Sequence, residues 1–360
     1  MNAAALALSD ANQRPYSAID PTSKLLHRRK QMKLEPKWLA RCAALAMTAA
    51  VAQGTMPTGA QAQAYPNQDI RLICAFPPGS GADVLVRYFA DKLRPIANRT
   101  VIVENKSGAG GNIAMEYVAR ARPDGHTIFV HAATAVAANQ HLFKKPPVDA
   151  AKAFQIAASI NRQPFMLVVD AKGPYKTVAE LTEAMRKKGD KATYASAAPT
   201  GTIMGEIYKD VTGIKAVEVN YRTAPDSLNE ILSGKVDYGM HDPVFSLAQQ
   251  REGRLRILAV STATRLQANP DMPTMTESGV PMDLTGWWAA MLPAGTPKPI
   301  VDKVNQWFTE MVKSEETKTF LNGFGGDPFI NTPDAAQALF LKAIKDWGDY
   351  VRLAKIVPQG

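Results

Sequence analysis

Apolar positions along the chain alternate between short β-prone runs and stretches with helical spacing. Residues 70–76 form a short apolar run that suits a buried strand. Two prolines then end the run, because neither can donate to a strand ladder, and Gly79 and Gly81 allow a tight turn. Val84 and Tyr88 stand four residues apart on one face of the helix that is predicted to follow. The first unit is therefore strand, glycine turn and helix.

The alternation continues to the end of the chain. Further strands are predicted at 100–104, 126–131, 154–160, 165–169, 193–196, 217–221, 236–240, 256–261 and 287–292. Further helices are predicted at 113–121, 132–142, 178–187, 203–211 (after a loop over 197–202), 226–233, 243–251, 299–312, 315–321 and 333–354. The strands at 165–169 and 287–292 are very apolar and are expected to cross between sheets. Alternating strands and helices predict an α/β fold with parallel sheets and turns at their carboxyl ends.

The first glycine turn has two interpretations. Free backbone N–H groups at the start of a helix attract an anion such as a phosphate or a carboxylate. Ser80 and Asp83, however, have the spacing of a capping box, so Asp83 is expected to serve its own helix in either case. The turn alone does not decide between a capped helix and an anion site.

The positive charge of the chain is concentrated near its N-terminus. The net charge is +9, and residues 1–62 hold 8 Lys/Arg against 3 Asp/Glu, which leaves 34 Lys/Arg against 30 Asp/Glu in the remainder. That remainder contains no dense basic run with interleaved aromatic residues. The composition therefore argues against nucleic acid as a partner.

The N-terminal excess has the pattern of an export signal. Basic residues between 28 and 41 precede an apolar run at 42–52, and small-x-small cleavage candidates follow at 60–64. The apolar run is too short for a bilayer, which needs about 20 residues. We therefore expect residues 1–64 to be a signal peptide with an upstream leader, and the mature protein to start near Tyr65 in the periplasm. No later segment is expected to span a membrane.

Cysteine usage adds little chemistry. Beyond the leader Cys74 is the one cysteine, so it cannot form an internal disulfide. It lies within the first predicted strand, where a buried and inert thiol is the expectation.

Two classes of enzyme fit the sequence poorly. Gly79 and Gly81 followed by the acidic Glu104 suggest a dinucleotide site, but Val84 takes the third glycine position, and export removes a chain from the nicotinamide pool. No G-x-S-x-G or H-E-x-x-H motif is present, which disfavours hydrolases. The histidines beyond the leader have no metal-ligand spacing: His126, His131, His141 and His241.

Four other features each have a structural and a functional interpretation. Residues 108–111 are either a plain turn or a nest of N–H groups for an anion. Residues 200–202 either cap a helix or offer hydroxyl and N–H donors to a ligand. Arg222 is either solvated or paired with a ligand carboxylate, and the tryptophans at 287–288 either pack in the core or contact a ligand.

A series of motifs is similar to one family of exported proteins. The matching segments are 76–83 (FPPGSGAD), 103–112 (VENKSGAGGN), 122–127 (RPDGHT), 193–196 (TYAS), 221–225 (YRTAP), 258–261 (LAVS) and 293–297 (PAGTP). In this order and over nearly the whole mature chain, they resemble the periplasmic solute-binding proteins of tripartite tricarboxylate transporters, also called Bug proteins. The series is far more specific than any of its single motifs.

The resemblance implies a two-lobed periplasmic binding protein, type II-like. Each lobe would be a mainly parallel sheet flanked by helices, with a cleft between the lobes. Lobe one would comprise 65–164 and 286–360, and lobe two 165–285. Carried over by motif, the ligand-binding residues would be Phe76, Pro78, Gly79, Ser80, Gly81, Asp83, Ala133, Thr134, Ser196, Ala197, Thr200, Gly201, Thr202, Tyr221, Arg222, Thr223 and Asp242.

The resemblance also implies a function and its partners. We expect a monomeric, non-catalytic protein without metal or cofactor that captures a dicarboxylate, tricarboxylate or aromatic acid. It would deliver this ligand to the membrane permease subunits of the transporter. Two alternatives stay open: an exported ligand sensor for a membrane kinase, and an enzyme on the α/β scaffold, which lacks an evident pair of nucleophile and base.

Overall fold

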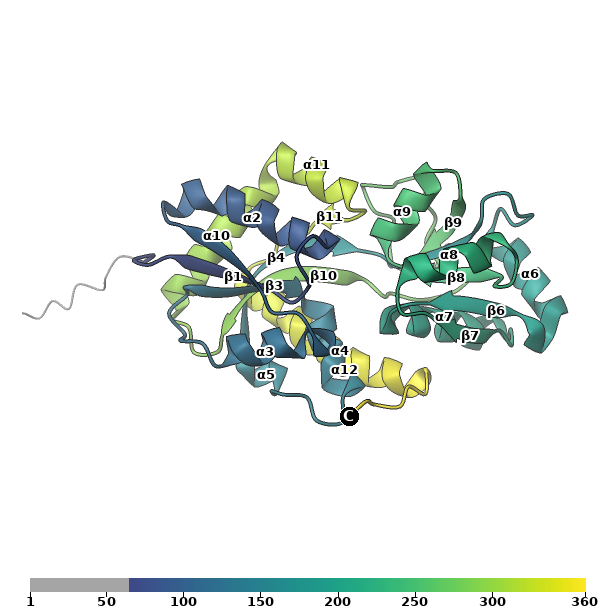
Figure 1. Cartoon of the computed structure of the whole chain (residues 1–360), viewed down its shortest axis with the longest axis horizontal. Helices are drawn as coiled ribbons and strands as arrows, with labels where there is room; N and C mark the ends of the chain where they lie inside the picture. Colours follow the sequence, from purple (N-terminus) through teal and green to yellow (C-terminus); the bar gives the residue numbers. More distant parts are fainter. Residues whose placement is uncertain (1–64) are drawn as a thin grey trace, which may run out of the picture. The chain divides into compact units, whose positions relative to one another are not determined.

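The computed structural model describes residues 65–360, which form a two-lobed α/β fold with two sheets (Figure 1). The expected leader, with its basic, apolar and cleavage segments, lies outside the described residues. No helix between Tyr65 and Gly360 combines the length and the apolar composition that crossing a bilayer demands.

The first sheet has six strands in the order β11-β4-β10-β3-β1-β2. They are β1 (Ile70–Cys74), β2 (Val101–Asn105), β3 (Thr127–Ala132), β4 (Phe154–Gln163), β10 (Gly286–Pro293) and β11 (Asp327–Pro328). β1 pairs in parallel with β2 and β3, whereas β10 is antiparallel to both β3 and β4. β4 therefore runs in the direction of β1, and only β10 and the two-residue β11 oppose it.

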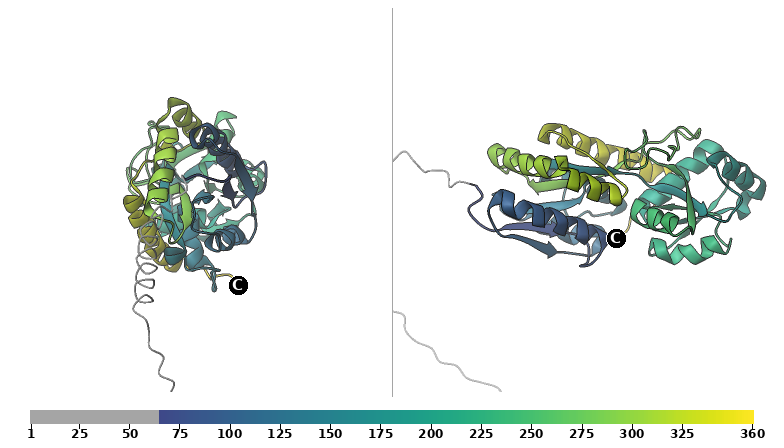
Figure 2. Two further views of the ribbon diagram at one scale, coloured as in Figure 1. Left: turned by 90° about the vertical axis from the view of Figure 1, so that its left-hand side faces the viewer. Right: turned by 90° about the horizontal axis from the view of Figure 1, so that it is seen from above.

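Helices cover both faces of this sheet, as Figure 1 and the further views in Figure 2 show. One face carries α2 (Gly81–Ala97), α10 (Lys298–Lys313) and α11 (Glu315–Gly323), and the other carries α3 (Asn112–Ala119), α4 (Ala133–Leu142), α5 (Ala150–Ala153) and α12 (Pro333–Leu353). Because side chains alternate along a strand, Leu72 of β1 enters the first of these cores and Ile73 enters the second.

The second sheet has five strands in the order β7-β6-β8-β5-β9. They are β5 (Met166–Asp170), β6 (Thr193–Ser196), β7 (Val217–Asn220), β8 (Tyr238–His241) and β9 (Leu255–Val260). One face packs against α6 (Val178–Lys188) and α7 (Pro199–Thr212), and the other packs against α8 (Ala224–Leu232) and α9 (Pro243–Arg251). Leu167 and Val168 of β5 face these two cores in turn.

The chain leaves the first sheet after β4, enters the second at β5, and returns from β9 to β10. When the chain enters a sheet at the side where the neighbouring strands have their carboxyl ends, the new strand must run antiparallel to those neighbours. Accordingly β5 is antiparallel to β8 and β9, and β10 is antiparallel to β3 and β4. The remaining long strands share one direction within each sheet, so their carboxyl ends meet where the chain crosses.

The predicted strands and helices occur in the predicted order. The strand at 193–196 and the helix at 243–251 match in both bounds, and Cys74 is a buried free thiol as expected. The loop predicted over 197–202 is wrong in its length, because α7 already begins at Pro199. The short elements α5, β11, η1 (Ala109–Gly111) and η2 (Gly189–Lys191) were not predicted, since two to four residues carry no periodic signal.

Candidate functional site

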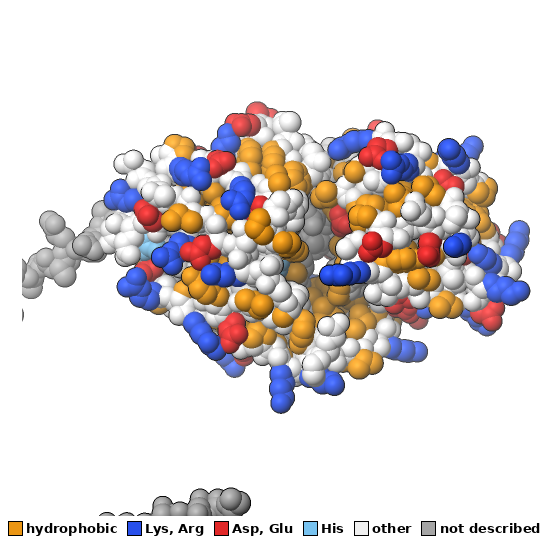
Figure 3. Space-filling view, viewed as in Figure 1, with side chains coloured by type: hydrophobic (Ala, Val, Ile, Leu, Met, Phe, Trp, Pro, Cys, Tyr) orange, Lys and Arg blue, Asp and Glu red, His pale blue; other side chains and the backbone are white. Residues whose placement is uncertain are grey.

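A cavity of about 1290 Å³ lies where strands of both sheets end. Its walls include Thr134 after β3, Ala197 after β6, Arg222 after β7 and Asp242 after β8. Figure 3 shows the surface hollowed between the part that carries α2 and α11 and the part that carries α8 and α9. Turns at the carboxyl ends of parallel strands are the usual location of ligand sites in α/β proteins.

The turn between β1 and α2 is closed by its own hydrogen bonds. Ser80 is the N-cap of α2, and its Oγ accepts from the N–H of Asp83 at 3.2 Å. The N–H of Gly79, a residue with a φ of 81°, donates to Oδ2 of Asp83 at 2.8 Å. The N–H of Ser80 donates to the carbonyl of Pro77 at 3.3 Å, while that of Gly81 has no acceptor among residues 65–360. Part of the donor set of this turn is therefore already engaged.

Asp83 fixes the turn against the neighbouring strand. Its buried carboxylate accepts from Nε of Arg87 at 2.8 Å and from Nδ2 of Asn105 at 2.8 Å, and Asn105 also donates to the carbonyl of Phe76 at 2.9 Å. Burial alone would raise the pKa of Asp83, but the hydrogen bonds from Arg87, Asn105 and Gly79 outweigh it and lower the pKa to about 2. Both oxygens thus serve the turn itself.

The start of α7 brings two predicted hydroxyls to the cavity. Pro199 is the first helical residue, a position where its missing N–H costs nothing. Thr200 and Thr202 therefore lie in the first turn of α7, and both line the cavity. Gly201 between them allows the helix to approach β8, because an added Cβ would lie 2.5 Å from the carbonyl oxygen of Met240.

The turn from β7 to α8 presents one unpaired cation. Thr223 is the N-cap of α8, and its N–H donates to Oδ2 of Asp226 at 3.0 Å. The hydroxyl of Tyr221 donates to Oε2 of Glu230 at 2.6 Å. Arg222 is exposed, lines the cavity and has no acid partner within the part of the chain that the structure describes.

Asp242 and His241 follow one another but face different surroundings. Asp242 lines the cavity and caps α9 by accepting the N–H of Phe245 at Oδ1, 3.0 Å away, and burial raises its pKa. His241 is buried, with Nε2 3.0 Å from Oγ of Ser227, and burial lowers its pKa to about 4. His241 is therefore neutral at pH 7 and is not part of the cavity wall.

The predicted ligand residues divide into two groups by position. Those that line the cavity are Phe76, Thr134, Ala197, Thr200, Thr202, Tyr221, Arg222 and Asp242. Those that lie outside its walls are Pro78, Gly79, Ser80, Gly81, Asp83, Ala133, Ser196, Gly201 and Thr223. Several of the second group support the first: Ser80 and Asp83 hold the turn after Phe76, and Gly201 lets α7 approach β8. The ligand contacts themselves stay a prediction.

Other cavity residues were missed by the sequence analysis. Glu218 and Asn220 of β7 face the cavity, and so does one side of α12 with Lys342, Asp346 and Tyr350. The spacing of four along α12 is a signal of one helix face, but its role depends on where the last helix returns in space. The tryptophans at 287–288 are buried in the core and also line the cavity, and their contact with a ligand stays a prediction.

The histidines are held apart by separate contacts. Nδ1 of His126 lies 3.2 Å from Asp124, and Nε2 of His141 lies 2.7 Å from the carbonyl oxygen of Ile344. His131 is buried against aromatic rings, and burial lowers its pKa to about 4. Among residues 65–360, no group of three or more His, Cys, Asp or Glu side chains is placed to hold a metal ion.

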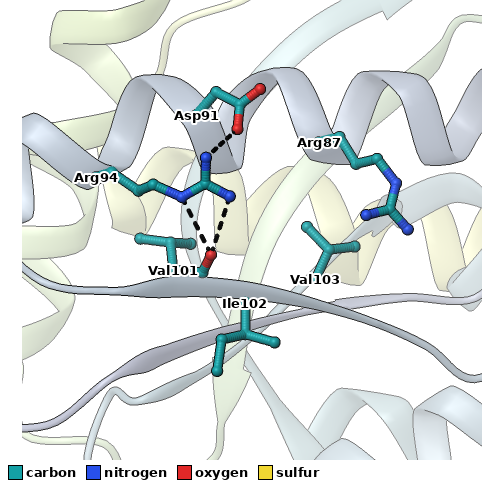
Figure 4. Close-up of a pocket in the computed structure, with 6 residues that line it drawn as sticks. All are labelled: Arg87, Asp91, Arg94, Val101, Ile102 and Val103. Atoms are coloured by element: carbon teal, nitrogen blue, oxygen red, sulfur yellow. Dashed lines mark hydrogen bonds and ion pairs between the residues drawn. The ribbon is translucent and has the colours of Figure 1, made fainter.

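A second, smaller hollow of about 360 Å³ lies between α2 and the edge strand β2 (Figure 4). Arg94 donates from Nε and Nη2 to the carbonyl of Val101, at 3.4 and 3.3 Å, and its Nη1 contacts Asp91. A guanidinium on an edge-strand carbonyl blocks pairing with another chain. We therefore assign the hollow a structural role.

Comparisons with known proteins agree with the fold. The model of a family described as "Tripartite tricarboxylate transporter family receptor" matches residues 85–354. A UPF0065 protein of Bordetella bronchiseptica is 29% identical over 302 residues, which cover 83% of this chain and 89% of the relative.

Two solved structures from Rhodopseudomonas palustris are similar along most of the chain. One, solved with adipate, is 28% identical with a TM-score of 0.72, and the match covers 82% of this chain and 99% of that one. The other, MatC with bound malate, is 25% identical with a TM-score of 0.66, and the match covers 80% of this chain and 100% of that one.

Proposed function

The chain belongs to the tripartite tricarboxylate transporter receptor family, and on that basis we propose that it captures a small organic carboxylate in the cavity between its two sheets. Receptors of this family are periplasmic solute-binding proteins and not enzymes. The proposal goes beyond family membership in three respects: the ligand of this chain, the residues that contact it, and the transporter that receives it.

The observation that carries the proposal is Arg222 in the cavity wall without an acid partner. A guanidinium presents a rigid fork that matches both oxygens of a carboxylate. Two helix starts border the same cavity, since Thr134 lies in the first turn of α4 and Thr200 in the first turn of α7. The dipoles of both helices favour an anion. In α7 the N–H groups of Gly201 and Thr202 already donate to the carbonyl of Ala198, which leaves the N–H of Thr200 for a ligand.

The expected ligand class is a dicarboxylate, a tricarboxylate or an aromatic acid. The two similar Rhodopseudomonas proteins were solved with adipate and malate, which are both dicarboxylates. The buried Trp287 and Trp288 and the half-buried Phe76 give the same cavity an apolar wall for a carbon skeleton or a ring.

We further propose that residues 65–164 with 286–360 and residues 165–285 act as two lobes that close over the ligand. The links between β4 and β5 and between β9 and β10 would provide the hinge. The closed form would then be recognised by membrane permease subunits. Export by the N-terminal leader would bring the protein to the periplasm.

A thermal-shift screen tests the proposal. The protein is heated with small carboxylates, amides and sugars, each at millimolar concentration. A ligand that binds only the folded chain raises its melting temperature by mass action, with about 2.7 kcal/mol gained at a concentration of 100 Kd. We expect shifts with carboxylates alone. Shifts with sugars but with no carboxylate would contradict the proposal.

A further inference from the structure

One acid in the cavity wall has no role in binding a plain carboxylate. Glu218 lies in β7, the edge strand of the second sheet, and its side chain lines the cavity. The hydroxyl oxygens of Ser196 and Thr202 both lie 2.5 Å from its Oε1 and can donate to it. Ser196 and Thr202 are themselves buried, so they hold the glutamate in one orientation. Two predicted ligand residues thus position a carboxylate of the protein.

The charge of Glu218 is not balanced by the protein. No Lys, Arg or His nitrogen within residues 65–360 forms an ion pair with it. Glu206 of the neighbouring helix is a useful contrast, because it accepts from Tyr194 at 2.9 Å and pairs with Lys209 at 2.7 Å. Glu206 does not line the cavity. The acid that faces the cavity is therefore the one left without a cation.

The cavity carries unbalanced groups of both signs on its lobe-two wall. Arg222 is an unpaired cation, while Glu218 and Asp242 are acids that have hydrogen bonds but no ion-pair partner among the described residues. A ligand with carboxylates alone would satisfy Arg222 but would bring like charge toward Glu218. A zwitterionic ligand would satisfy both groups, because a protonated amine offers three donors to a carboxylate.

We propose that the ligand is a carboxylate that also bears a protonated amine, with Glu218 as the residue that selects the amine. This inference rests on the proposed function and narrows its ligand class to amino acids. In the bound state the ligand carboxylate lies toward Arg222 and the helix starts, and the ammonium group donates to the free oxygen of Glu218. Ser196 and Thr202 act as positioning residues that keep Oε1 engaged.

Pairs of ligands that differ in the amine alone test the inference. Isothermal titration calorimetry of the full chain at pH 7.5 compares aspartate with succinate, and glutamate with glutarate. We expect at least one amine-bearing member to bind at least tenfold more tightly than its deaminated partner, which corresponds to about 1.4 kcal/mol. Equal or tighter binding of the deaminated partner in both pairs would overturn the role of Glu218 and leave the proposed carboxylate function standing.

Two glutamine variants separate the role of Glu218 from a general loss of charge. Glu218→Gln keeps a side-chain oxygen for the Ser196 and Thr202 hydroxyls but removes the negative charge. We expect it to abolish the preference for the amine, with the affinity for the deaminated partner unchanged or higher. Glu206→Gln, the matched control outside the cavity, should keep the preference. A preference that survives Glu218→Gln would overturn the inference.

The outcomes distinguish failure of the inference from failure of the proposed function. If the protein binds no acid of either kind, the proposed function fails and the inference fails with it. If acids bind but the amine has no effect on affinity, the inference alone fails. If Glu218→Gln does not fold, the comparison of ligand pairs on the unaltered protein still decides.

Discussion

Nη2 of Arg162 donates to Oδ2 of Asp327 across 3.1 Å, in the strand pair at the edge of the first sheet. The same carboxylate accepts the N–H groups of Gln267 at 2.9 Å and Ala268 at 2.8 Å, which lie in the return segment between β9 and β10. One buried acid therefore connects β11 to the segment that links the two sheets. Because Arg162 also lines the cavity, this connection joins the site to the proposed hinge.

Replacing Asp327 should destabilise the protein strongly. Asp327→Ala leaves one guanidinium and two backbone N–H groups without their acceptor, and we expect a loss of about 2–4 kcal/mol in the free energy of unfolding. Urea denaturation at pH 7.5 measures the loss. Asp302→Ala, which removes an exposed partner of Lys298, is the control and should change stability by less than about 1 kcal/mol. An equal effect of both substitutions would contradict the role of Asp327.

Gly201 should tolerate no side chain. In Gly201→Ala the new Cβ would stand 2.5 Å from the carbonyl oxygen of Met240 and 3.3 Å from Cβ of Ser196, so α7 must shift away from β8. We expect a loss of about 1–3 kcal/mol in stability and a weaker affinity, since Thr200 and Thr202 move with the helix. Gly323→Ala, where an added Cβ meets nothing within 4 Å, is the matched control. Stability equal to that of the control would show that the contact is relieved without cost.

Stability should fall between pH 6.5 and pH 4 because of two buried histidines. Burial lowers the pKa of His131 and of His241 to about 4, below the ordinary value of 6.5. Between these values each of the two histidines binds more protons in the unfolded chain than in the folded chain, so its contribution to stability is present above pH 6.5 and is lost as the pH falls. Each histidine contributes about 3 kcal/mol at most. The lowered pKa of Asp83 acts only at lower pH, below 3.8.

Urea titrations at pH 7.5, 6.0, 5.0 and 4.5 measure this dependence. His131→Asn should lower the absolute stability but should reduce the slope against pH, because it removes one of the two groups that titrate on unfolding. A slope that is the same with and without His131 would show that its protonation is not coupled to unfolding.

Arg222 should matter for binding and not for folding. It is exposed and has no acid partner within the described residues, so Arg222→Met should leave the melting temperature of the free protein within about 1 °C. The affinity for a bound carboxylate should fall by about 10- to 100-fold, the value of a lost charged hydrogen bond. Lys215→Met, an exposed cation just before the other end of β7, is the control and should keep the affinity. Calorimetry that finds Arg222→Met as tight as Lys215→Met would remove Arg222 from the site.

The sequence was informative about elements and less so about which side chains share a cavity. The side chains of Leu72 and Ile73 enter opposite cores, and a local run of apolar residues such as this one is enough to predict a strand that is buried on both faces. The start of α7 could also have been placed, because Pro199 is a typical first helical residue, but residues 197–202 were predicted to form a loop. Gly201 is instead a packing glycine, and the carbonyl of Met240 that requires it lies almost forty residues away.

The cavity wall depends on such distant contacts. Glu218 was not predicted as a site residue because nothing in its local sequence distinguishes it from a solvent-facing glutamate. Its orientation depends on hydrogen bonds from the buried hydroxyls of Ser196 in β6 and Thr202 in α7, which are distant in the sequence. The same holds for α12, whose face with Lys342 and Asp346 reaches the cavity only because the last helix packs back on the first sheet.

The most direct test of the account is a crystal structure of the protein with an acid that raises its melting temperature. We predict that the acid lies in the cavity between the two sheets, with a carboxylate oxygen within hydrogen-bonding distance of Arg222 and its carbon skeleton against Phe76 or Trp288. An acid bound elsewhere on the protein, with this cavity filled by water alone, would contradict the account.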